Sequence, residues 1–147
     1  MDFINRIIYD LTQGHPLHTM FVHFPIALTA AAAFFILLAL WRHSDLLEQV
    51  AFANMSLAAV STLLTAITGI RDNILLYNGA APNANVKIVL GSILFVVTTG
   101  TALVRWRKPD IFHAPLLQRL LYVSAYGLSF ALAAVLGFLG GVILYGF

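Results

Sequence analysis

The sequence predicts an all-α fold: an integral membrane bundle of four helices, preceded by a short interfacial helix. Hydrophobic residues fill 61% of the 147 positions and charged residues only 10%, whereas an ordinary soluble domain is about 25% charged. A chain this apolar must use lipid as the solvent for most of its exterior. The length suits one small domain, so we expect a single membrane domain over residues 1–147 in contact with the bilayer.

The first twelve residues predict the interfacial helix. Five apolar side chains recur there at helical spacing: Phe3, Ile4, Ile7, Ile8 and Leu11. The segment 1–12 is too short to cross a bilayer, so it is expected to lie along the membrane surface. Gly14 then ends it, and Pro16 suits the first turn of the helix that follows.

Four longer apolar runs predict the membrane spans, at about 17–41, 47–70, 86–106 and 116–145. Each run reaches the roughly 20 residues that a crossing requires. Pro25 removes a backbone donor inside the first span and predicts a bend one turn past His23. The last span carries a small residue at every fourth position: Ala125, Ser129, Ala133, Gly137 and Gly141. Such a stripe packs helices closely, either within the bundle or across a dimer.

Basic residues predict the orientation in the membrane. Four spans place both termini on one side and the connections near 42–47 and 105–119 on the other. The side of those two connections holds five basic residues and the terminal side three, namely Arg42, Arg105, Arg107, Lys108 and Arg119 against Arg6, Arg71 and Lys87. Lysine and arginine favour the cytoplasmic side, so both termini are predicted to lie outside the cytoplasm. The basic residues therefore set topology and predict no nucleic-acid partner.

Three of the five histidines lie within nine residues at the start of the first span: His15, His18 and His23. The topology gathers further charged residues at the same outer end: Arg71, Asp72 and Lys87. Imidazole ligates haem iron, zinc and copper. On an ideal helix His18 and His23 point about 140° apart, so the three histidines share a site only if the chain at His15 is not helical or the helix bends at Pro25.

His23 is the deepest of the three, about six residues into its span and roughly 9 Å along a helix. An unpaired imidazole at that depth would be costly, so we expect it to have a partner. One possibility is a hydrogen bond to Thr65, to Thr68 or to a backbone carbonyl freed by Pro25. The other possibilities involve a cofactor.

The sequence is compatible with two alternative cofactor sites. In the first, His23 ligates haem b, and the second axial ligand comes from His15, His18, Lys87 or a second copy of the chain, because no other histidine lies deep in a span. In the second, a transition metal ion binds four residues: His15, His18, His23 and Asp72. The absence of cysteine excludes thiolate ligands and disulfides in either case.

Several residues also have simpler interpretations. Lys87 fits an interfacial lysine that extends its amine toward water, and Asp72 fits a solvated partner of the adjacent Arg71. His43 and His113 fall in predicted interfacial connections. We expect no carboxylate within the spans, and the sequence contains no nucleophile–base pair, phosphate loop or inverted repeat. These features predict no reaction of the chain's own and argue against a proton-coupled transporter.

The segments His15–His18 and Val22–Leu28 resemble the start of a family of small bacterial predicted membrane proteins of unknown function, which have four spans and an HPxH…HFPIAL motif. Thr68–Asp72 is similar to the TGxxD that ends the family's second span. Some relatives are joined to Rieske-type ferredoxin domains, which implies a redox setting and a haem. The matching positions that the resemblance marks as functional are His15, His18, His23 and Asp72. Many relatives carry a histidine near the start of the third span, where this chain has Lys87.

The residues and the resemblance together predict a small redox component of the bacterial inner membrane. It would bind haem b or a metal ion through the outer histidine cluster and pass electrons to a protein partner in or on the membrane. The alternative is an accessory or structural subunit, without a cofactor, in a homo-oligomer or a larger membrane assembly. A transport or proton-relay role comes third.

Overall fold

The computed structural model describes residues 3–9 and 16–145, nearly all of them helical. The elements in chain order are α1 (Phe3–Tyr9), α2 (Leu17–Phe21), α3 (His23–Arg42), α4 (Asp45–Tyr77), α5 (Ala84–Arg107), the 3₁₀ turn η2 (Ile111–His113) and α6 (Leu116–Tyr145). Four segments are long and apolar enough to cross a membrane: α2 with α3, α4, α5, and α6. The predicted all-α membrane bundle is confirmed.

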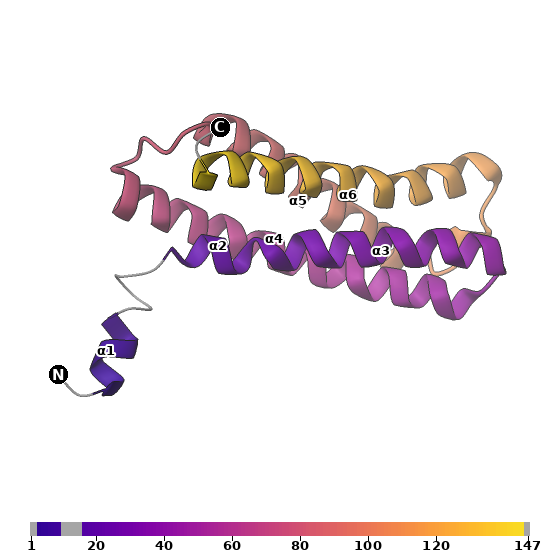
Figure 1. Ribbon diagram of the computed structural model, residues 1–147. Coiled ribbons are helices and arrows are strands. Elements are labelled where there is room, and N and C mark those ends of the chain that lie inside the picture. Colours follow the sequence, from indigo (N-terminus) through magenta and orange to yellow (C-terminus); the bar gives the residue numbers. More distant parts are fainter. Residues whose placement is uncertain (1–2, 10–15, 146–147) are drawn as a thin grey trace.

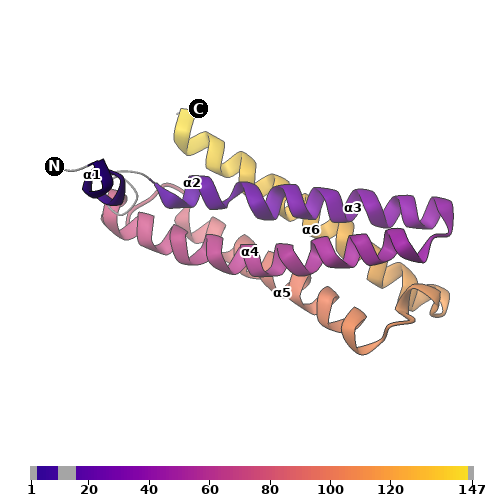
Figure 2. The same cartoon turned by 90° about the horizontal axis from the view of Figure 1, so that it is seen from below.

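The four long helices form a closed bundle, in which α3 packs on α4, α4 on α5, α5 on α6 and α6 on α3. Figures 1 and 2 show α3 and α4 side by side along their length. The α3–α4 and α5–α6 connections lie at one end, which we call the basic end because it carries the five basic residues noted above. The other end, here the terminal end, holds α2, the α4–α5 connection and the end of α6.

The first span is interrupted at Val22, between α2 and α3. Pro25 is the cause, because it has no N–H to bond to the carbonyl of Phe21 four residues earlier. The hydroxyl of Thr65 on α4 lies 3.1 Å from that carbonyl oxygen and 2.8 Å from the carbonyl oxygen of Ser61, so the two oxygens share it. The interruption therefore falls one residue before His23, and not one turn past it as the sequence predicts.

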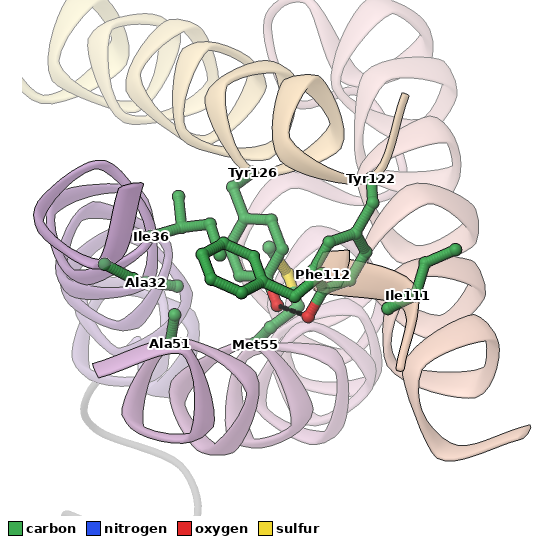
Figure 3. Close-up of a cluster of buried hydrophobic side chains, with 9 residues drawn as sticks. Ala32, Ile36, Ala51, Met55, Ile111, Phe112, Tyr122 and Tyr126 are labelled. Carbon is green, nitrogen blue, oxygen red and sulfur yellow. Dashed lines mark hydrogen bonds between the residues drawn. The ribbon is translucent and has the colours of Figure 1, made fainter. Parts of the chain in front are cut away.

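Small residues hold α3 against α4. Ala32, Ala39, Ala51 and Ala58 are fully buried, and side chains of this size let two backbones approach closely. At the basic end the η2 turn folds inward and inserts Ile111 and Phe112 among the helices, as Figure 3 shows. The main apolar core therefore lies toward the basic end.

The stripe of small residues on α6 is used inside the bundle. Ser129 and Ala133 are buried, and a Cβ atom at Gly137 would lie 2.9 Å from Cδ1 of Ile26 on α3. The exterior is apolar, with side chains such as Phe34, Leu37 and Val96 at least 60% exposed, as expected of a surface that faces lipid. Of the two alternatives for the stripe, packing within the bundle therefore applies at Ser129, Ala133 and Gly137.

One helix, α4, is clearly longer than predicted. α4 continues for seven residues past Ile70, to Tyr77, and ends where Asn78 and Gly79 adopt positive φ angles of 49° and 81°. Its 33 residues span about 50 Å, against about 30 Å of hydrocarbon. The contacts of α4 with α2 include Thr65, Gly69 and Asp72. Within the predicted helix 1–12, residues 3–9 form α1, and the other positions lie outside the described residues. α1 lies apart from the bundle in Figure 1. Its location along a membrane surface stays a prediction.

Candidate functional site

A buried carboxylate at the terminal end fixes α2 to α4. The backbone N–H of His18, in the first turn of α2, donates to Oδ2 of Asp72 at 2.8 Å. Nη1 of Arg71 donates to the other oxygen, Oδ1, at 2.6 Å. The first N–H groups of a helix lack partners within it and favour a negative charge. Asp72 therefore caps α2 from outside, at a residue that is only 4% exposed.

The imidazole of His18 is held by a second contact with α4. Its Nδ1 lies 3.0 Å from the carbonyl oxygen of Thr65. A carbonyl only accepts hydrogen bonds, so Nδ1 carries the proton and donates. Nε2 then has a free lone pair in the neutral ring, and it has no partner among the residues that the structure describes. A histidine whose Nδ1 donates to a backbone carbonyl is the usual form of a metal-ligating histidine.

The imidazole of His18 packs directly against Gly69 of α4. A Cβ atom at Gly69 would lie 3.0 Å from Nδ1 and 3.1 Å from Cε1 of His18, so any larger residue would displace the imidazole. Thr65, Gly69 and Asp72 are spaced four and three residues apart and therefore share one face of α4. That face contacts His18 three times, through a carbonyl oxygen, a van der Waals surface and a carboxylate.

A second polar cluster lies at the basic end. Nε and Nη2 of Arg105 on α5 donate to the two carboxylate oxygens of Glu48 on α4, at 2.6 and 2.9 Å. The hydroxyl of Tyr122 donates to Oε1 of Glu48 at 2.6 Å and lies 2.6 Å from the hydroxyl of Tyr126. Figure 3 shows the two tyrosines of α6 converging beside Met55 and Phe112. The guanidinium of Arg105 also lies over the ring of Phe52, 5.4 Å from its centroid.

A family model described as "Predicted membrane protein (DUF2231)" matches residues 14–147. The chain belongs to this DUF2231 family. The match covers all four spanning helices and both polar clusters, and it confirms the resemblance noted from the opening motif. No curated protein and no solved structure matches the chain. The DUF2231 protein is thus a multi-pass membrane protein in contact with the lipid bilayer.

The predicted ligands of the DUF2231 protein do not all converge. His15 lies outside the described residues. His23 is exposed on the surface of the bundle and has no hydrogen bond with any described residue, so the partner expected for it within the bundle is not found there. The two hydroxyls predicted as its partners donate elsewhere: that of Thr65 to the carbonyl freed by Pro25, and that of Thr68 to carbonyls of its own helix. Among the described residues no three histidine or carboxylate side chains come close enough to hold a metal ion.

One of the simpler interpretations, that of Asp72, also changes. Asp72 does pair with Arg71, but its side chain is only 6% exposed and not solvated, because α2 covers it. Lys87 is half-buried, and its side chain has no hydrogen-bond partner in the described part of the chain; its role stays a prediction. His43 and His113 lie exposed in the connections at the basic end, where Nε2 of His113 is 2.7 Å from Oδ1 of Asp45.

Sequence reasoning missed the cluster at the basic end. The expectation of no carboxylate within the spans is wrong, because Glu48 lies inside the predicted second span and is only 2% exposed. A signal was available in the sequence. The start of the second span and the end of the third meet in an antiparallel pair, so Glu48 and Arg105 had to lie at the same depth. The pairing was missed because Arg105 was used only to predict the orientation in the membrane.

Proposed function

We propose that the DUF2231 protein binds haem b through Nε2 of His18 and serves as a small electron-transfer component of the bacterial inner membrane. One observation carries the proposal. The Nδ1–H of His18 donates to the carbonyl of Thr65, and Nε2 has no partner among the described residues. This hydrogen bond selects the tautomer and orients the ring, as partners of ligating histidines do.

The residues present favour haem over a bare metal ion. A structural or catalytic transition metal takes three or four protein ligands, and the described residues offer no such group. Haem iron has four ring nitrogens of its own and needs one or two protein ligands. With no cysteine in the chain, the haem would be held without thioether bonds, as haem b.

The second axial position has four candidates, which are His15, His23, Lys87 and a residue of a second copy of the chain. His23 is exposed at the terminal end, so it is available to a group that binds outside the helix core. The excess of basic residues at the opposite end supports an orientation in which His18 faces away from the cytoplasm. Electrons would then pass between this site and a redox protein in or on the membrane.

An absorption spectrum tests the proposal. The full chain, produced in a haem-synthesising bacterial host and purified in detergent, is expected to show a Soret band and about one haem per chain by pyridine haemochrome assay. His18→Ala should lose the haem. His43→Asn is the matched control, because it changes a histidine at the basic end, where φ is 50° and asparagine is tolerated.

The variant His23→Ala tests whether His23 is the second axial ligand. Loss of the low-spin spectrum with retained haem would assign the second axial position to His23. A colourless wild-type protein that also fails to take up added haemin would refute the proposal, as would equal haem content in wild type and His18→Ala. A colourless protein recovered in a stoichiometric membrane complex would instead favour the accessory-subunit role.

A further inference from the structure

An open groove of about 620 Å³ runs between α5 and α6 toward the basic end. Its walls are mainly apolar and include Val97, Val104, Leu121 and Leu128, and Gly100 forms part of its lining. The volume lies within the range of about 300–1,000 Å³ that is typical of ligand sites. A Cβ atom at Gly100 would meet nothing within 4 Å, so the groove is not filled at that point by the chain's own side chains.

The length of the groove matches one leaflet of a bilayer. Along α5 the lining extends from Val96, near the middle of the bundle, to Lys108, which directly follows the helix at the basic end. Twelve residues of α-helix rise about 18 Å, and half of the hydrocarbon core is about 15 Å thick. On α6 the lining runs in parallel from Leu128 to Gln118. An extended acyl chain fits a groove of this length and direction.

The polar groups are distributed as an anionic lipid requires. The hydroxyls along the groove are already used within the chain: Thr101 donates to the carbonyl of Val97, Ser124 to that of Leu121, and Tyr122 to Glu48. Only the basic end offers polar side chains without partners among the described residues, namely the exposed Lys108 and Gln118. Arg107 and Arg119 add positive charge nearby along the sequence.

We propose that the α5–α6 groove binds an anionic phospholipid of the leaflet at the basic end. One acyl chain lies between the apolar walls, and the phosphate is bound by Lys108 and Gln118 at the mouth. Basic pockets between membrane helices bind anionic headgroups in this way. A quinone is a poorer fit, because its ring would need hydrogen-bond partners along the groove, where each hydroxyl already donates elsewhere. The site is independent of the proposed haem ligand at the other end.

Native mass spectrometry of the full chain in detergent tests this site, with phosphatidylglycerol and phosphatidylcholine as the two probes. Wild type should retain one phosphatidylglycerol in preference to phosphatidylcholine and unfold at a higher temperature when phosphatidylglycerol is added. Gly100→Leu should abolish both effects by filling the groove. Gly91→Leu is the matched control, since Gly91 lies on the same helix, has nothing within 4 Å of a Cβ atom and does not line the groove.

Lys108→Gln gives a second, independent test that leaves the core untouched, because Lys108 is exposed. It should weaken phosphatidylglycerol binding about fivefold, the contribution expected of one basic residue near an anionic lipid, and leave phosphatidylcholine binding unchanged. Equal retention of the two lipids by wild type would overturn the proposal. So would equal retention by Gly100→Leu and Gly91→Leu, or release of the bound lipid by a quinone at equimolar concentration.

Discussion

The two polar clusters of this bundle differ in how completely their groups are satisfied. At the basic end, both oxygens of Glu48 accept hydrogen bonds, and Arg105 and Tyr122 come from two different helices to donate them. At the terminal end, Asp72 is likewise satisfied, but the imidazole that it helps to position keeps one nitrogen without a partner in the described structure. The satisfied cluster links three helices, whereas the terminal cluster leaves one ring nitrogen of His18 for the ligand that we propose.

The clusters also differ in what they connect. The basic-end cluster joins α4, α5 and α6 through a buried, bidentate ion pair, and such a pair is strongly destabilising when only one partner is removed. The terminal cluster joins the five-residue α2 to α4. We therefore expect mutations at the basic end to affect mainly the stability of the bundle, and mutations at the terminal end to affect mainly the position of His18.

The largest effect is expected from Arg105→Met, which leaves the carboxylate of Glu48 buried without its charged partner. The free energy of unfolding should fall by about 3–5 kcal/mol, as measured by chemical denaturation in detergent. The double variant Glu48→Leu with Arg105→Met replaces the pair by apolar side chains and should recover most of this loss. Equal instability of the single and double variants would show that the ion pair is not the source of the effect.

Gly69→Ala should have the next largest effect, at the terminal end. The added Cβ would meet the His18 ring at 3.0 Å, and this overpacking costs about 1–3 kcal/mol relative to Gly91→Ala, where a Cβ meets nothing within 4 Å. Because the ring must move away from the Thr65 carbonyl, any haem content should fall as well. Identical unfolding curves for the two alanine variants would contradict the close approach of His18 to α4.

Asp72→Ala removes the external cap of α2 and should cost about 0.5–2 kcal/mol, the usual effect of losing a helix cap. Asp72→Asn keeps an oxygen that can accept from the N–H of His18, so its loss should be smaller. Hydrogen exchange should report faster exchange in residues 18–21 for the alanine variant, with little change at the basic end. A global loss of protection would mean that Asp72 supports the whole bundle.

The smallest effect is expected from Tyr126→Phe at the basic end. It removes one hydroxyl from the cluster while Tyr122 keeps its bond to Glu48, so the loss should be about 0.5–1.5 kcal/mol. Tyr122→Phe is the comparison. It removes the hydroxyl that donates directly to the buried carboxylate of Glu48, so the free energy of unfolding should fall further. If the two variants have the same free energy of unfolding, the hydroxyl of Tyr122 contributes no more to stability than that of Tyr126.

The sequence alone predicted the four spanning helices, the shared location of residues 18, 72 and 87 at one end, and the family. Hydropathy is a local property that accumulates along a segment, and a helix that crosses the bilayer has only two possible directions. These two facts fix which ends of the helices meet. The alternation of helices also implied that Glu48 and Arg105 lie together, although the loop charges directed attention elsewhere.

Only the tertiary structure decided which side chain faces which neighbour. His18 and His23 are both near the start of the first span, yet His18 packs on α4 and His23 faces outward, because the interruption that Pro25 causes and the space at Gly69 set the rotation of this segment. The partner of Glu48 is 57 positions away in the sequence. Such pairings depend on helix rotation and on packing between distant segments, which local composition does not encode.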